Sequence, residues 1–344
     1  MTTLMQQEIF SEPTMLKNTI KACSSVLPAL KAEFKKRKIT KIVTMARGTS
    51  DNAATVFSFL CPLKTGLVTS KFHPSIFTVY DQKVNLNDTM MVIISQSGMS
   101  KDTIKVMNDA KACGAMIVGV TNNAESPIAK ESDFHLFMDV EEEKSVAATK
   151  TYIGEIFALS MLVDALAEDN SVDYNEIANN INALLSLFDN QVSAMAEDMY
   201  KKNNFIILSR GTTLGSGDEL SLKLTECCYI FNRSYSSANF MHGPLSLLDS
   251  NANVIMLAPD SQFTQEFIDM ANRIKEKDAT LYAFTDIKEI QNMSTKFVNM
   301  PKTNNLTSPI YYGVMASLLA LSIGLKKGHN VDAPRNLKKV TVTL

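Results

Sequence analysis

The sequence has few of the features that mark metal-binding or nucleic-acid-binding proteins. Its cysteines are odd in number, scattered along the chain and without the paired spacing of a metal site: Cys23, Cys61, Cys113, Cys227 and Cys228. The formal net charge of −2 gives no electrostatic footprint for nucleic acid or for an anionic membrane. We therefore expect no metal, no cofactor, no nucleic-acid partner and reduced thiols, as in a cytosol.

Signals for export or membrane insertion are also missing. The first ten residues are polar and mixed, without a basic segment followed by an apolar one, so they do not form a signal peptide. No uninterrupted apolar run approaches the roughly 20 residues needed to span a bilayer. We expect a cytoplasmic protein with no membrane partner. Its 344 residues, 45% of them hydrophobic, predict two full-sized domains.

No nucleotide-binding loop is present, because neither G-x-G-x-x-G nor G-x-x-x-x-G-K-[ST] occurs. Instead, the apolar run Met90–Ile94 is followed by Ser95-Gln-Ser-Gly98 and by a helical pattern from Asp102. This order predicts a buried strand, a turn and a helix. Ligands of open α/β sheets bind at such turns, and a helix amino end favours an anion. A small phosphorylated ligand fits; the alternative is an ordinary turn whose serines cap the helix.

The chain contains an internal repeat. The segment Lys41–Ser50 resembles Asn204–Thr213, since each reads as a strand that ends in Arg-Gly-Thr and a second hydroxyl residue. At equal distances beyond them lie the apolar segments 91–94 and 254–257, and a third pair follows, 115–121 with 279–285. Strands that alternate with helices predict parallel sheets covered by helices on both faces. We expect a duplicated α/β fold, with a doubly wound parallel sheet in each half.

The predicted domain boundary falls between residues 165 and 166. Residues 1–165 hold a helical lead-in and the first domain, and residues 166–344 hold a connector helix over 174–188, the second domain and an extended tail. The alternation over 340–343 favours an ordered tail. Only the first half has the hydroxyl-rich turn; the second has Ala258-Pro-Asp260, whose acid would repel phosphate. Anion binding is therefore predicted for the first half.

Three ionisable residues follow the second Arg-Gly-Thr. Glu219, Lys223 and Glu226 are spaced so that a helix places them on one face. The ordinary interpretation of such a pattern is a solvated face with an ion pair. The functional one is favoured here because the helix begins at the carboxyl end of a strand, the ligand side of these folds.

Two further candidates lie on loops. Only four histidines occur, and His242 precedes Gly-Pro, a turn signal. It is either a structural loop residue or a general acid–base group. Near the end of the chain, Lys339 follows the segment Pro334–Leu337. It belongs either to a disordered basic tail or to a site where a lysine pairs with phosphate or forms a Schiff base.

These motifs resemble the sugar isomerase (SIS) domain family, and within it the isomerase half of the glutamine–fructose-6-phosphate aminotransferases. The resemblance runs from about Ile9 to the C-terminus. The motifs that carry it occur in the order of the family: Arg47–Ser50, Ser95–Gly98, Val146–Lys150, Glu219 to Glu226, His242–Pro244 and Pro334–Leu337 with Lys339. It implies two tandem SIS domains.

The resemblance also implies a role for individual residues. Those implied to bind the phosphate are Ser50, Ser95, Gln96, Ser97 and Ser100, with Thr49 and Val146 near the sugar. Glu226 would move a proton between C1 and C2, His242 would assist ring opening from the neighbouring subunit of a homodimer, and Lys339 would form a Schiff base. Glu219 and Lys223 would support the site. No metal is implied.

Several positions depart from the family pattern. The aminotransferases have a glutaminase domain whose nucleophile is an N-terminal cysteine. The present chain begins Met-Thr-Thr, so we expect no ammonia from glutamine. Met99 stands where the phosphate loop of the family commonly has Glu, and Ala148 stands where the aminotransferases have Ser. We expect an amino-substituted hexose 6-phosphate to be isomerised with release of ammonia, as by a glucosamine-6-phosphate deaminase. The alternatives are a fructosamine-6-phosphate deglycase and a non-catalytic sugar-phosphate sensor.

Overall fold

The computed structural model describes residues 2–339 and contains two compact units that interleave along the sequence. The first unit consists of Ser11–Lys144, Lys150–Asn179 and residues 337–339. The second consists of residues 2–10, Ser145–Thr149 and Asn180–Asn336. The predicted boundary after residue 165 stays a prediction, and the predicted order over 340–343 lies outside the described residues.

The first unit is built around a parallel sheet of five strands within the described residues, in the order β2-β1-β3-β4-β5. Its strands are β1 (Lys41–Met45), β2 (Thr69–Lys71), β3 (Thr89–Ile94), β4 (Met116–Thr121) and β5 (Phe134–Phe137). Every residue of β3 and β4 is buried, as expected for central strands covered on both faces. The buried apolar run at 90–94 therefore predicts the central strand correctly.

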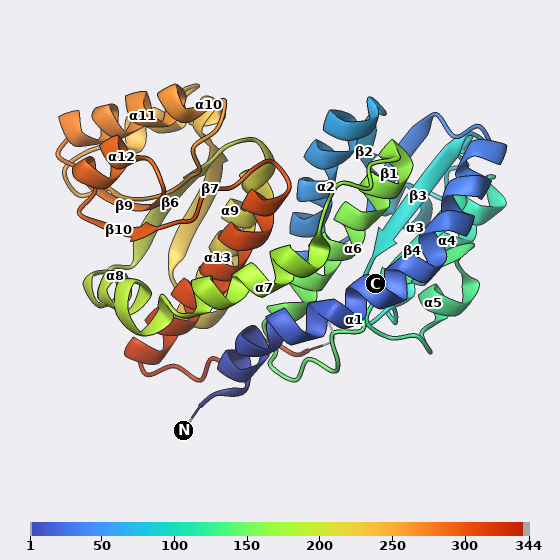
Figure 1. Ribbon diagram of the computed structural model, residues 1–344, viewed down its shortest axis with the longest axis horizontal. Coiled ribbons are helices and arrows are strands. Elements are labelled where there is room, and N and C mark those ends of the chain that lie inside the picture. Colours follow the sequence, from blue (N-terminus) through green and yellow to red (C-terminus); the bar gives the residue numbers. More distant parts are fainter. Residues whose placement is uncertain (1, 340–344) are drawn as a thin grey trace. The chain divides into compact units, whose positions relative to one another are not determined.

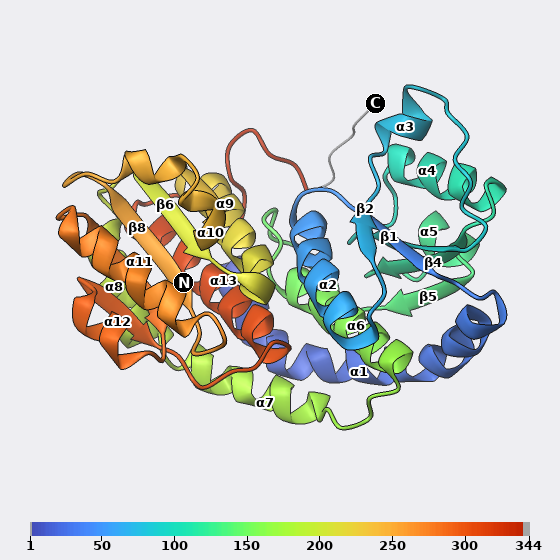
Figure 2. The same cartoon turned by 90° about the horizontal axis from the view of Figure 1, so that it is seen from above.

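Helices cover both faces of this sheet. They are α2 (Thr49–Thr65), α3 (Ser75–Thr78), α4 (Lys101–Ala112), α5 (Pro127–Glu131) and α6 (Lys150–Ala167). Figure 1 shows α2 and α6 on one side of the sheet and α4 and α5 on the other, and the turned view of Figure 2 agrees. One apolar cluster lies beneath α4 and includes Met91, Ile93, Val106 and Met107. This arrangement is the doubly wound α/β fold.

The second unit repeats this design. Its sheet has the order β10-β9-β8-β6-β7 and is again parallel, with five strands among the residues described. They are β6 (Asn204–Ser209), β7 (Phe231–Ser236), β8 (Asn253–Ala258), β9 (Thr280–Thr285) and β10 (Lys296–Asn299). The two sheets correspond strand by strand, which confirms the duplicated α/β fold predicted from the repeat.

Helices flank the second sheet as well (Figures 1 and 2). On one face are α10 (Ser237–Phe240), α11 (Thr264–Glu276) and α12 (Lys288–Met293). On the other are α8 (Ser193–Met199), α9 (Leu214–Cys228) and α13 (Thr307–Lys326). The remaining helical segments are α1 (Leu4–Lys36), α7 (Tyr174–Leu185), a π-helical turn (Phe188–Val192) and two short 3₁₀ turns (Gly211–Thr213 and Pro244–Leu247). The helix predicted over 174–188 is thus α7 and the start of the π-helical turn.

The helix α13 is long and apolar enough to cross a membrane, with a mean hydropathy of 1.5 over its most apolar window. However, 94% of that window is buried within the protein, as in a core helix. Counting uninterrupted apolar residues passes over α13 because serines and glycines, such as Ser317 and Gly324, divide its apolar run. Its burial explains its composition without a membrane.

The fold brings the predicted ligand turn to one edge of the first sheet. Met45, the last residue of β1, pairs with Ile93, the last residue but one of β3, so the two strands end within one residue of each other. The chain order reverses direction between these two strands, which is where ligands bind in doubly wound sheets. The segments Arg47–Ser50 and Ser95–Ser100 therefore leave the sheet side by side.

Candidate functional site

A cleft of about 310 Å³ opens at this edge of the first sheet. It is lined by Arg47, Gly48, Ser50, Ile94, Ser95, Gln96, Ser97, Ser100, Asp102, Thr103 and Lys339. Thr49 begins α2 between two of these residues and is half-buried. The cleft thus unites the phosphate-binding residues predicted from the turn with the lysine predicted from the far end of the chain.

The loop 95–100 holds its shape through its own hydroxyl groups. The backbone N–H of Gly98 donates to Ser95 Oγ over 3.2 Å, and that of Met99 donates to Ser97 Oγ over 3.3 Å. Ser100 stands before α4 in an extended conformation, and its side chain makes no capping bond to the helix. The alternative in which the serines merely cap the helix therefore does not describe Ser100.

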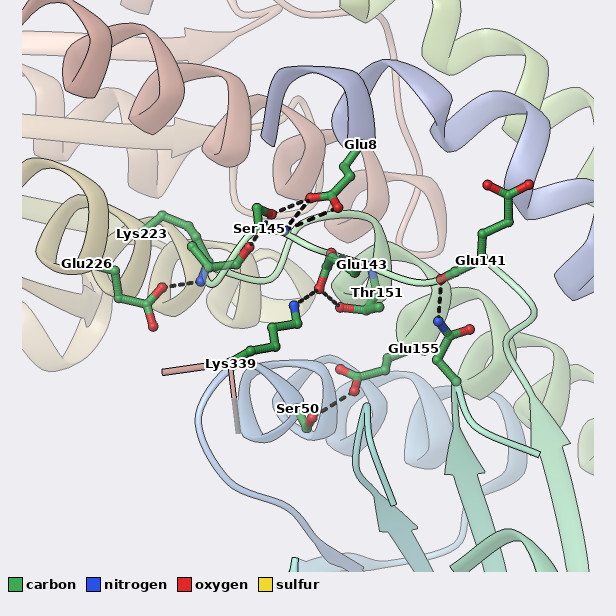
Figure 3. Close-up of polar contacts among 12 residues, drawn as sticks. Glu8, Ser50, Glu141, Glu143, Ser145, Thr151, Glu155, Lys223, Glu226 and Lys339 are labelled. Carbon is green, nitrogen blue, oxygen red and sulfur yellow. Dashed lines mark hydrogen bonds and ion pairs between the residues drawn. The ribbon is translucent and has the colours of Figure 1, made fainter. Parts of the chain in front are cut away.

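Charged and buried groups surround the loop. The guanidinium of Arg47 donates through Nε to Asp102 Oδ2 over 2.9 Å, where the Asp102 side chain is 4% exposed. Ser50 is buried in the first turn of α2, and its Oγ donates to Glu155 Oε1 over 2.7 Å (Figure 3). Ser50 is thus oriented by a carboxylate of α6 that the sequence motifs did not single out.

Lys339 is held by a buried carboxylate. Its Nζ lies 2.6 Å from Glu143 Oε2, and the Glu143 side chain is fully buried while that of Lys339 is 25% exposed. Glu143 also accepts hydrogen bonds from the backbone N–H and the Oγ1 of Thr151, over 3.2 and 2.7 Å. Figure 3 shows this group, with the lysine and the threonine converging on one carboxylate. The ion pair fixes the ammonium end of Lys339, a residue that also lines the cleft.

In the second unit, the predicted triad lies on α9 as its spacing indicated. Lys223 is fully buried; its Nζ lies 3.3 Å from Glu219 Oε1 and donates to Glu226 Oε2 (Figure 3). Glu219 is fully buried, whereas the Glu226 side chain is 21% exposed. Burial lowers the pKa of Lys223, but the nearby carboxylates outweigh burial and raise it. Glu226 is therefore the member of the triad that a small molecule can reach.

The other two predicted residues of this unit lie apart from the triad in the sequence. Val146 is half-buried, and its backbone N–H donates to the Asp332 carbonyl over 2.9 Å. Asp332 also accepts the backbone N–H groups of Leu4 and Met5, which begin α1. His242 is exposed on the turn between α10 and the following 3₁₀ turn. Its side chain is thus free of the core, as the Gly-Pro signal predicted.

Sequence reasoning missed two acidic residues of the first unit, Glu143 and Glu155. Glu143 ends an acidic run three residues before Val146, the start of the Val146–Lys150 motif, and Glu155 lies five residues after Lys150. A search for isolated charges beside a motif, on a helix otherwise apolar, would have found Glu155. No group of three or more histidine, cysteine or acidic side chains among residues 2–339 has the geometry of a metal site. All five cysteines are free thiols.

A comparison with protein families agrees with the two-sheet fold. The model of the SIS domain matches residues 34–165 and again residues 198–323, one match for each sheet. The chain belongs to the SIS-domain family. The family resemblance predicted from the motifs is thereby confirmed, and with it the two tandem SIS domains.

Curated relatives extend over nearly the whole chain. The glutamine–fructose-6-phosphate aminotransferase [isomerizing] of Haemophilus influenzae is 32% identical over 361 residues, and that of Thermococcus kodakarensis is 30% identical over 349. Each match covers 98% of this chain and 58% of the relative. The chain thus spans little more than half the length of these enzymes and matches their isomerase half.

Solved structures show the same fold. The C-terminal domain of glucosamine-fructose-6-phosphate aminotransferase from Francisella tularensis has a TM-score of 0.87 and 25% identity, covering 97% of this chain and 99% of that one. Glucosamine-6-phosphate deaminase from Thermotoga maritima has a TM-score of 0.79 and 20% identity, covering 99% and 100%. At that identity the second likeness concerns the fold alone.

Proposed function

We propose that this protein is a phosphosugar isomerase that acts on an amino-substituted hexose 6-phosphate and releases ammonia, as a glucosamine-6-phosphate deaminase does. The observation that carries the proposal is the cleft of the first unit, where a hydroxyl-lined loop at a helix amino end adjoins Lys339. Such a loop suits a phosphate, and a lysine suits a carbonyl or imine carbon. The curated relatives support the substrate class, since their names include fructose 6-phosphate and isomerisation.

The residues divide the work as follows. The phosphate is bound by Ser50, Ser95, Gln96, Ser97 and Ser100, and the sugar lies near Thr49 and Val146. After His242 has assisted ring opening, Glu226 takes the proton from C2 and returns it to C1. The amine at C2 thereby becomes an imine. The amine of Lys339 attacks the C2 imine carbon and displaces ammonia, which forms a Schiff base at C2, and water then hydrolyses this C=N bond to give the ketone and the free lysine.

The triad on α9 favours this proton transfer. Lys223 stays an ammonium because the nearby carboxylates raise its pKa, and it orients the Glu226 carboxyl group through a hydrogen bond. An ionised carboxylate is the form that accepts a proton from carbon. Glu219 is the second carboxylate that pairs with the buried Lys223 ammonium. The further expectations of a homodimer and of a cytoplasmic location stay predictions.

The test is to incubate the purified protein with glucosamine 6-phosphate and to measure fructose 6-phosphate and ammonium together. We expect equal amounts of both. Glu226→Gln should lower the turnover by a factor of about 10²–10⁴ while substrate binding persists. Glu197→Gln, an exposed acid that pairs with Lys326, is the matched control and should keep the wild-type rate.

Three outcomes would contradict parts of this proposal. Wild-type turnover in Glu226→Gln means that Glu226 is not the base. Thermal stabilisation by the sugar without any turnover makes the protein a sensor rather than an enzyme. No response to this sugar at all rejects the substrate, and fructosamine 6-phosphates, the substrates of a deglycase, are then the next to test.

A further inference from the structure

The second unit has a cleft of its own at the carboxyl edge of its sheet. β6 and β8 are neighbours, as β1 and β3 are in the first sheet, and the segments 210–213 and 259–263 follow them. These segments and residues around the start of α13 line a cavity of about 240 Å³. Doubly wound sheets bind ligands at this position, yet the proposed reaction gives this cavity no role.

The frame of this cleft repeats that of the first unit. Arg210 Nε lies 3.3 Å from Glu266 Oε1, and Glu266 belongs to the first turn of α11. In the same way, Arg47 pairs with Asp102 in the first turn of α4. The Arg210 guanidinium also lies over the ring of Phe263, 5.1 Å from its centroid. The second cleft thus has a wall that its own side chains hold in place.

The loop after β8 lacks the donors that a phosphate needs. Pro259 has no backbone N–H, and that of Asp260 donates to Asp286 Oδ1 over 2.8 Å. The backbone N–H of Ser261 donates to Thr264 Oγ1 over 2.9 Å. The Asp260 carboxylate adds a negative charge that repels an anion. The ligand of this cleft therefore differs from that of the first unit.

The other polar groups of the cavity suit hydroxyl groups and an ammonium. Thr303 Oγ1 is buried and has no hydrogen-bond partner among residues 2–339, and such a group is costly unless a ligand or water pairs with it. Asp260 is exposed, and its Oδ1 accepts Thr264 Oγ1 over 2.6 Å, which leaves its charge accessible to a cation. The wall also has three side-chain amides, which both donate and accept hydrogen bonds: Gln262, Asn304 and Asn305.

We propose that this cleft is a second binding site, for a monosaccharide that carries an amino group and no phosphate. Asp260 pairs with the ammonium, and the amides and Thr303 bind the sugar hydroxyls. The volume lies below the roughly 300–1,000 Å³ of pockets for drug-sized ligands, so the occupant is no larger than a single sugar ring. The site lies wholly within the second unit and goes beyond the proposed function, because its ligand does not react.

The probe is glucosamine, and glucose is its match with a hydroxyl in place of the amine. Ligand-observed NMR titration of the full chain, at a pH where the amine is protonated, measures both dissociation constants. We expect glucose to bind about tenfold or more weakly than glucosamine. Asp260→Asn keeps an oxygen for Thr264 but removes the charge, so it should weaken glucosamine binding about tenfold or more and leave glucose binding unchanged.

Two further variants control this experiment. Asp269→Asn makes the same chemical change on α11, at an exposed acid that accepts a hydrogen bond from Gln265, and should keep the wild-type affinity. Ser95→Ala alters the cleft of the first unit and should also keep it. Thermal unfolding shows that each variant is folded.

Three results would overturn the proposal. These are no binding of glucosamine to the wild type, equal affinities for glucosamine and glucose, and wild-type affinity for glucosamine in Asp260→Asn. If Ser95→Ala alone loses the binding, the amino sugar occupies the first cleft instead. None of these measurements follows turnover, so their failure is distinct from a failure of the proposed reaction.

Discussion

At the scale of single residues, the buried lysine of α9 has a large energetic consequence. Lys223 is fully buried and lies between Glu219 and Glu226. A buried ion pair is weak evidence of net stability, but removing one partner leaves an uncompensated charge in the core. Replacing one of these three residues should therefore change the free energy of unfolding far more than replacing one partner of a surface pair.

Lys223→Met should lower the free energy of unfolding by about 3–5 kcal/mol, because it removes the buried ammonium that lies 3.3 Å from the fully buried Glu219 carboxylate. Chemical denaturation measures the loss. The control is Lys326→Met, which removes a partly exposed pair with Glu197 and should cost less than about 1 kcal/mol. An equal loss in the two variants would mean that the Glu219 carboxylate is neutral in the fold and needs no ammonium.

At the scale of elements, the backbone geometry of the turn between β3 and α4 bears on the proposed phosphate binding. Gly98 has a φ of +62°, and a Cβ placed there would lie 2.6 Å from Ser126 Cβ and 3.2 Å from a methyl group of Thr121. Ser126 cannot withdraw easily, since its Oγ caps α5 by accepting the N–H of Ala129. The loop therefore has its shape only with glycine at this position.

Gly98→Ala should cost about 1 kcal/mol for the left-handed backbone and about 1–3 kcal/mol more for the steric clash, and it should abolish stabilisation by inorganic phosphate. Thermal unfolding with and without phosphate measures both effects. Gly66→Ala is the control: Gly66 has a φ of +72°, but nothing lies within 4 Å of an added Cβ. Gly66→Ala should lose only the stability that the left-handed backbone costs, and it should keep the response to phosphate. A normal phosphate response in Gly98→Ala would place the anion elsewhere.

At the scale of the whole molecule, the exposure of His242 bears on how many chains make one site. The histidine lies on an exposed turn of its own unit. A general acid–base group works best where water is excluded, so another surface must cover His242 if it takes part in the reaction. The homodimer implied by the family resemblance would supply that surface.

Subunit complementation tests this arrangement. Mixing inactive Glu226→Gln and His242→Ala proteins after reversible dissociation should restore about one quarter of the wild-type activity, since half of the random dimers are mixed and each has one intact composite site. Activity of the mixture against each variant alone is the measurement. If His242 serves the site of its own chain, every site in the mixture is defective and no activity returns.

Most of the fold could be predicted from short stretches of sequence. The buried strands β3, β4, β8 and β9 are nearly continuous apolar runs, which only a sheet covered on both faces explains. The strands β2 and β7 were not predicted, because a short polar segment such as Thr69–Lys71 has no buried face to mark it. Their pairing depends on the neighbouring strand rather than on their own side chains.

By itself, the sequence determined the duplicated α/β design, the turn at Ser95–Gly98 and the helical face of Glu219, Lys223 and Glu226, since apolar periodicity and turn chemistry act over a few residues. Only the tertiary structure decided that Lys339 meets Glu143 and that Glu12 is buried without a hydrogen-bond donor from residues 2–339. The state of a charged group depends on its solvation and on its partners, and both are set by segments that lie far apart in the chain.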